Sequence, residues 1–183
     1  MWGGLTAPAL FAAMTLGGAG HAQPVTLVED LPDGVDVAVV DIRPEADCLK
    51  ASLPDARCLP ADWLVRVDES GVIGFHALRW LLGTIGLDGR ETLAVYPGPD
   101  GPTQDAWAVG ALTYLAGQAD VVVLAGGTTG RNGWPRNENR EAVYTAPMRV
   151  AAMTVDASGA PLRDQLADFA QGRRETVAFA PDT

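Results

Sequence analysis

Three short, uninterrupted apolar runs constrain the fold of this chain more than any other feature. They are Val37–Val40, Leu93–Tyr96 and Val121–Leu124. Each run is apolar at consecutive positions rather than at alternate ones, so each fits a strand that is buried on both faces, as in a parallel sheet. Apolar strands of this kind that alternate with helices form βαβ units.

The connections between these runs contain helical patterns. Pro44 suits the first turn of a short helix over Glu45–Ser52. Residues Arg57–Leu59 could form a brief strand after it. A second helix is predicted over Phe75–Ile85. Its predicted apolar face consists of Ala77, Trp80, Leu81 and Ile85.

The clearest helix is predicted over Thr103–Gly117. Thr103 suits the N-cap, Asp105 is favourable at the positive end of the helix dipole, and Gly117 is a natural stop. One apolar stripe at helical spacing contains Ala106, Trp107, Gly110, Ala111, Tyr114 and Leu115. These patterns together predict an α/β fold with a parallel sheet. Trp107 is expected to pack in its core.

The chain divides into a main domain over residues 24–147, which begins with the polar segment Pro24–Asp36, and an extension over 148–183. The extension is predicted to be a short α/β segment. It contains a strand-like Val150–Val155, a helix around Leu162–Ala170 and a strand-like Thr176–Phe179. Whether it extends the sheet, packs on its edge or covers a loop stays open at this point.

Residues 1–22 contain no Asp, Glu, Lys or Arg and are rich in Ala, Gly and Leu. The apolar stretch Leu5–Leu16 is shorter than the roughly 20 residues of a membrane span, but it suits the h-region of a signal peptide. Gly20 and Ala22 offer a cleavage site before Gln23, although a positive n-region is missing. We therefore expect a periplasmic or secreted protein. A retained N-terminal anchor is the alternative, and only then would a membrane be a partner.

The charge balance excludes one class of partner. Lys and Arg total 13 and Asp and Glu total 23, which gives a net charge of −10. A surface this acidic repels phosphate backbones, so nucleic acid is not expected to bind. Arg131, Arg136 and Arg140 are expected to be scattered charges in a solvated loop.

The sequence offers no metal site and no motif for a cofactor. His76 is the single histidine after residue 22, and we expect it on the surface. The two cysteines, Cys48 and Cys58, fit neither a CxxC motif nor the ligand spacing of a zinc site.

Several segments, in this order along the chain, resemble landmarks of the rhodanese family. Val39–Arg43 is similar to the family's strand followed by Asp-x-Arg. Leu53–Ala56, with Leu59–Pro60 after it, is similar to the family's Ile-Pro-Gly-Ala segment and its trailing proline. The usual Gly-His just before this segment is Ala51–Ser52 here.

The later landmarks complete the resemblance, which covers roughly residues 37–135. Leu93–Tyr96 stands in the place of the strand that leads into the family's active-site loop. Val123–Gly127 resembles the Leu-x-Gly-Gly turn, and Gly133–Pro135 resembles the closing Gly-x-Pro. The resemblance implies a sulfurtransferase fold, which is a parallel sheet of about five strands with helices on both faces. It also implies that the loop after Tyr96 is the functional site.

Sulfur transfer in this family needs a cysteine thiolate in a cradle of backbone N–H groups at a helix N-terminus. The equivalent stretch here, Pro97–Thr103, contains no cysteine, and Pro97 stands where the family's cysteine belongs. Its three prolines remove three N–H donors. Asp100 and Asp105 add negative charge, and Asp105 takes the place of the family's arginine.

Each of these changes opposes a bound thiosulfate or persulfide. We therefore expect a catalytically inactive binding or accessory module rather than an enzyme. Its partner would be a protein or a small polar ligand, unless the loop is only a stiff surface segment. The residues of the expected binding loop are Pro97, Gly98, Asp100, Gly101, Thr103, Gln104 and Asp105.

Cys48 and Cys58 leave three possibilities open. They could be buried as small hydrophobic residues, or they could form a disulfide that closes a short loop in an oxidising compartment. Alternatively, one of them could be a displaced catalytic cysteine, with Arg57 beside Cys58 lowering its pKa. That third possibility would make the chain a divergent thiosulfate or persulfide sulfurtransferase.

Overall fold

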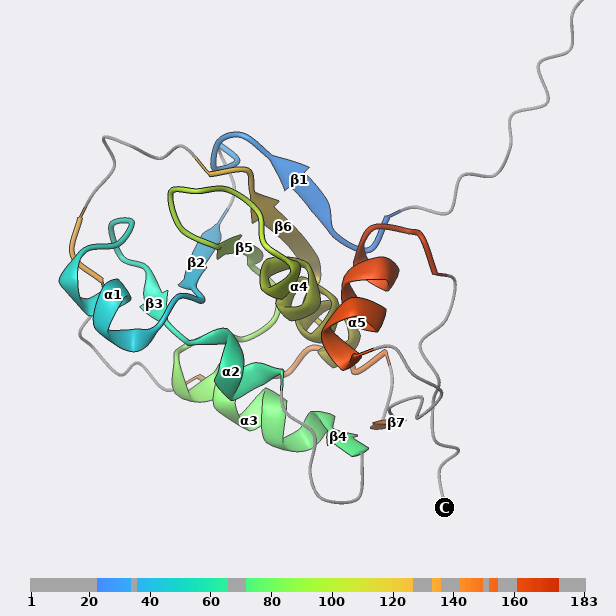
Figure 1. The fold of residues 1–183 in the computed structure, drawn as a ribbon. Coiled ribbons are helices and arrows are strands. Elements are labelled where there is room, and N and C mark those ends of the chain that lie inside the picture. Colours follow the sequence, from blue (N-terminus) through green and yellow to red (C-terminus); the bar gives the residue numbers. More distant parts are fainter. Residues whose placement is uncertain are drawn as a thin grey trace, which may run out of the picture.

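A five-stranded sheet forms the centre of the computed structural model, which describes residues 23–33, 36–65, 72–126, 133–135, 142–149, 152–154 and 161–174. All paired neighbours in this sheet run parallel, in the order β1-β6-β5-β2-β3 (Figure 1). The strands are β1 (Thr26–Val28), β2 (Val37–Asp41), β3 (Arg57–Cys58), β5 (Thr92–Tyr96) and β6 (Asp120–Leu124). The predicted α/β fold with a parallel sheet of about five strands is confirmed.

Helices and one small additional sheet surround this centre (Figure 1). The helices are α1 (Glu45–Lys50), α2 (Ala61–Leu64), α3 (Phe75–Thr84), α4 (Gln104–Ala116) and α5 (Leu162–Ala170). In the small sheet, β4 (Val72–Gly74) pairs antiparallel with β7 (Ala152–Thr154), inside the strand predicted over residues 150–155. None of the described helices is long and apolar enough to cross a membrane.

Several expectations concern residues outside the described ranges. They are the leader 1–22, the arginines at 131, 136 and 140, Gly127, and the strand expected over 176–179. Strand β1 was not predicted, and it lies within the polar segment Pro24–Asp36. This edge strand has three residues and its side chains are mostly solvent-exposed, so it lacks the continuous apolar run that reveals a buried strand.

Alternate residues of the central strands divide the core into two clusters. Ala38, Leu93 and Val121 point toward the face that carries α2, α3, α4 and α5. Val39 and Ala94 point toward the opposite face, where they meet the turn Leu53–Ala56 that follows α1. Both faces of these strands are therefore buried, which explains why the runs are apolar at every position.

The apolar face predicted for α3 is confirmed at Leu81 and Ile85, which pack partly buried against the large cluster, and is wrong at Ala77 and Trp80. Trp80 is 73% exposed and Ala77 is also exposed, whereas Leu78 and Leu82 are buried in the large cluster together with Phe75. Apolar residues occur nearly all around this helix, so their spacing alone did not select the face that meets the sheet. His76 lies on the exposed side, as expected.

Helix α4 is buried on almost every side because it lies between the sheet and α5 (Figure 1). The predicted ends are confirmed: the Ala106 N–H donates to Thr103 Oγ1 at 3.2 Å, and Gly117 ends the helix with a φ of +118°. Trp107 is half-buried against the large cluster. The helix of the extension, α5, packs on α4 and contributes Leu166 to the core.

Candidate functional site

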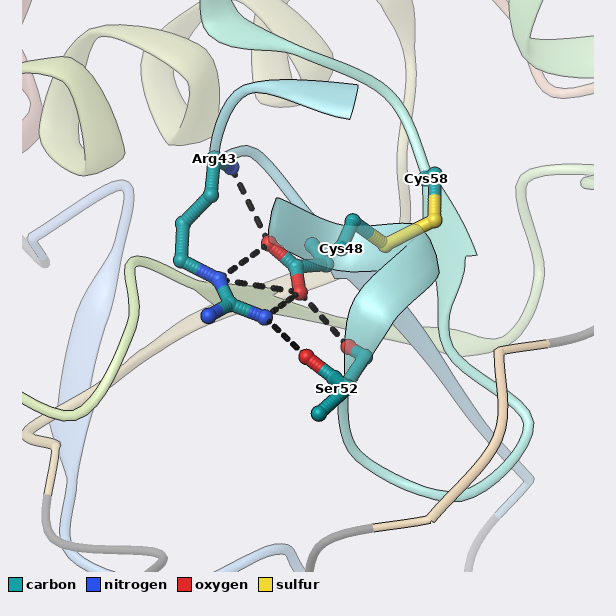
Figure 2. Close-up of a disulfide and its surroundings, with 6 residues drawn as sticks. Arg43, Cys48, Ser52 and Cys58 are labelled. Carbon is teal, nitrogen blue, oxygen red and sulfur yellow. Dashed lines mark hydrogen bonds and ion pairs between the residues drawn. A yellow bond between two sulfur atoms is a disulfide. The ribbon is translucent and has the colours of Figure 1, made fainter. Parts of the chain in front are cut away.

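A buried carboxylate, that of Asp41, lies at the carboxyl end of β2, next to the loop that follows β5. Arg43 Nη2 donates to Asp41 Oδ2 at 2.6 Å, and Arg43 Nε lies 3.0 and 3.1 Å from the two carboxylate oxygens (Figure 2). The Arg43 backbone N–H donates to Oδ1 at 3.0 Å, and Ser52 Oγ donates to Oδ2 at 2.6 Å. Both oxygens are thus fully satisfied, as a buried charge requires. The hydrogen bonds from Arg43 to Asp41 also raise the pKa of the guanidinium.

Arg43 connects this cluster to the loop after β5. Its guanidinium lies 5.3 Å from the centre of the Tyr96 ring, and Nη2 also donates to the Ala51 carbonyl at 2.6 Å. Its aliphatic stem lies against Gly98, where an added Cβ would come within 2.9 Å of Arg43 Cδ. In the sequence, Asp41 and Arg43 were only landmarks of the resemblance. In the folded chain they form the centre of the site. The sequence did not show this, because both residues are far from the loop along the chain.

A disulfide joins Cys48 of α1 to Cys58 of β3 beside this cluster (Figure 2). Of the three possibilities left open by the sequence, this is the one that the structure contains. In the strand register, Cys58 is paired with Asp41, which in turn is paired with Tyr96. Because neighbouring strands lie about 4.8 Å apart, Cys58 is roughly 10 Å from Tyr96 on the same edge of the sheet.

The predicted binding loop runs from Pro97 to the start of α4, but only part of it is accessible. Pro97 and Gly98 are buried, as is Gly101, whereas Asp100 and Thr103 are exposed. Gly98 and Gly101 both have left-handed backbone conformations, with φ of +114° and +96°. The loop is closely packed on the turn after β6, since a Cβ on Gly126 would approach Gly101 Cα to 2.6 Å. The loop is therefore closely packed at its base and solvent-exposed at its tip.

Helix α5 contacts the last two residues of the predicted binding loop. Gln104 Nε2 donates to Asp164 Oδ1 at 3.0 Å, and Asp105 forms an ion pair with Arg163 at 2.5 Å. Arg163 also pairs with Asp62 of α2. Gln104 and Asp105 are thus bonded within the chain and are less available to a ligand. No local pattern could reveal this, because Arg163 lies 58 residues from Asp105.

The opposite edge of the sheet carries a cavity that the sequence did not predict. It has a volume of about 810 Å³ and lies at the amino ends of β2 and β5. Its charged lining residues are Asp36, Asp55, Arg57, Asp88, Arg90 and Glu91. Glu91 is largely buried, and its Oε2 accepts a hydrogen bond from the Arg90 N–H at 3.0 Å. Burial raises the pKa of Glu91, and the neighbouring Asp88 raises it further.

Replacing Asp88 with asparagine is expected to lower the pKa of Glu91, because the variant removes a negative charge beside it. Asparagine can keep the bond that Asp88 Oδ1 accepts from the Arg90 N–H at 2.9 Å. A pKa raised by folding stabilises the protein at low pH, and this contribution is lost as the pH rises through the raised value. Because the pKa of Glu91 is raised less in the variant, its free energy of unfolding should fall less as the pH rises through that pKa. Carbon-13 NMR titration of the Glu91 carboxyl group checks this, and an unchanged pKa would contradict it.

Comparison with known proteins gives one similar structure. No protein-family model matches the chain, and no curated protein sequence matches it. Among solved structures, the chain is similar to one described as the crystal structure of a probable thiosulfate sulfurtransferase, with 24% sequence identity and a TM-score of 0.46. The match covers 66% of this chain and 51% of that chain, so it spans about half the length of that protein.

Proposed function

We propose that this chain is an exported, catalytically inactive rhodanese-like module that binds a protein partner or a small polar ligand through the loop between β5 and α4. The order of the rhodanese-like motifs along the chain supports the family, and three of these motifs lie at the ends of β2, β5 and β6. One observation carries the proposal of inactivity: the loop has no thiol, and the chain's two cysteines are bonded to each other.

Sulfur transfer requires a thiolate that can attack a sulfane sulfur. In the oxidised chain of 183 residues, both cysteine sulfurs are in the disulfide, so no thiolate can form. Pro97 is buried directly after Tyr96, and the exposed group at the loop tip is the Asp100 carboxylate. A negative group at this position repels thiosulfate and any anionic persulfide.

The disulfide also supports export. Disulfides persist in the periplasm and outside the cell, and they are rare in the reducing cytosol. A module of this kind would therefore work in the compartment that the leader at residues 1–22 suggests.

The accessible tip of the loop indicates the chemistry of a partner. It consists of Pro99, Asp100, Pro102 and Thr103. Prolines limit the backbone freedom that is lost on binding, which favours recognition by a preformed surface. Asp100 offers only acceptor oxygens, so it would favour a basic group or an N–H donor on the partner.

The first test is an assay of sulfur transfer from thiosulfate to cyanide, using the oxidised protein. The control is the double variant Cys48→Ser/Cys58→Ser, which contains no cysteine. We expect no activity above this control. Activity that disappears in the double variant would overturn the proposal of an inactive module.

A second candidate function, a divergent sulfurtransferase, is favoured by the position of Cys58 at the same edge of the sheet as the loop. This function would require reduction of the disulfide first. Assays of the reduced protein and of its Cys58→Ser and Cys48→Ser variants would separate the two candidates. Activity that appears on reduction and is lost in only one single variant would identify the reacting cysteine.

A further inference from the structure

We propose that the Cys48–Cys58 disulfide is a redox latch: it holds Arg43 against the loop between β5 and α4, and its reduction loosens that loop without unfolding the sheet. This inference rests on the proposed function only where it treats the loop as the binding surface. The latch itself is a property of the fold.

The first step concerns the attachment of α1. This helix has six residues, too few to be stable by itself, and Cys48 is its only buried residue. The disulfide ties this residue to Cys58 of β3. Reduction therefore removes the covalent bond that holds α1 against β3.

The second step leads from the disulfide to Arg43. The bond closes a loop with a sequence separation of 10 residues, and Ala51 and Ser52 lie inside it. The Ala51 carbonyl accepts from Arg43, and Ser52 Oγ donates to Asp41 (Figure 2). A looser segment after α1 would therefore weaken a contact to each member of the buried ion pair.

The third step leads from Arg43 to the binding loop. Arg43 is packed against Gly98 and lies over the Tyr96 ring, so its stem forms one wall of the loop's base. Gly98 has a left-handed backbone conformation that a glycine adopts freely and can leave as freely, so the Arg43 stem packed against it is a support that restricts its motion. If Arg43 gains freedom, Gly98 loses that support.

The reaction itself is thiol–disulfide exchange with a dithiol. A thiolate of the dithiol attacks Sγ of Cys58, because Cys58 is the half-buried residue of the pair and Cys48 is fully buried. Cys48 then leaves as a thiolate and takes a proton. The second thiol of the dithiol attacks the mixed disulfide and releases Cys58, which also takes a proton. The dithiol becomes a cyclic disulfide, so two electrons and two protons have passed to the protein.

Nitrogen-15 relaxation of the intact chain, oxidised and reduced with dithiothreitol, tests the latch. We expect the backbone order parameters of Gly98 and Gly101 to fall from about 0.85 to below about 0.6 on reduction. Ala51 and Ser52 should change in the same way. Leu112 in α4 and Val123 in β6 should keep their rigid values, because they lie in the core away from the disulfide.

The variant Cys48→Ala/Cys58→Ala is the matched control. It should show the loosened loop without any reductant, and dithiothreitol should not change it further. A loss of order confined to residues 48–58, or an equal loss across the whole chain, would overturn the latch and leave an ordinary structural disulfide.

This readout needs neither a ligand nor sulfur-transfer activity. A rigid loop in the reduced protein would therefore reject the latch and leave the proposed binding function standing. Sulfur transfer by the oxidised protein would reject the inactive module and leave the latch measurement unaffected.

Discussion

Replacing Asp41 with alanine is expected to lower the free energy of unfolding by about 3–5 kcal/mol, because it breaks a buried ion pair from one side. Asp41 is fully buried and accepts hydrogen bonds from Arg43 and Ser52. Without the carboxylate, the Arg43 guanidinium keeps the Ala51 carbonyl as its hydrogen-bond acceptor, and the Ser52 hydroxyl loses its acceptor. Urea unfolding of the oxidised wild type and variant measures the difference.

The matched control for Asp41 is Glu45→Ala. Glu45 is a nearby carboxylate at the start of α1, but its side chain is exposed. Its replacement should change the free energy of unfolding by no more than about 0.5–1 kcal/mol, through the helix dipole alone. A loss for Asp41→Ala as small as this would show that the buried pair does not hold the carboxyl edge of the sheet together.

Replacing Leu166 with alanine is expected to destabilise the protein by about 2–5 kcal/mol, because the variant leaves a cavity between α5 and α4. Leu166 is fully buried and belongs to the same core cluster as Leu112 and Leu115 of α4. The loss should appear as a lower urea midpoint of a single cooperative transition, if α5 unfolds together with the sheet.

Leu49→Ala provides the same chemical change at an exposed position, since Leu49 on α1 is 49% exposed. It should cost well under about 1 kcal/mol, because little apolar surface is lost from the core. If Leu166→Ala lowered the free energy of unfolding by as little as Leu49→Ala, α5 would contribute no packing to the core. Helix α5 would then be a peripheral element attached through polar contacts such as those of Arg163 and Gln104.

The binding loop shows how far local sequence information reaches. Consecutive residues show that the loop lacks a cysteine and contains three prolines. They also predict that it precedes a helix capped by Thr103. The accessibility of the loop could not be predicted in this way, because Gly98 and Gly101 are buried where they pack against Arg43 and the turn at Gly126. The bonds of Gln104 and Asp105 to α5 likewise join residues that are far apart in the chain.

By itself, the sequence determined the buried strands β2, β5 and β6 and the helix α4, because continuous apolar runs and helix caps act within a few neighbouring residues. The tertiary structure alone decided the edge strand β1 and which side of α3 is buried in the core, since both depend on a surface supplied by other segments. It also chose the disulfide from three possibilities. Cys48 and Cys58 bond because α1 and β3 fold back on each other and bring their Cα atoms to 5.8 Å, a distance that sequence spacing does not specify.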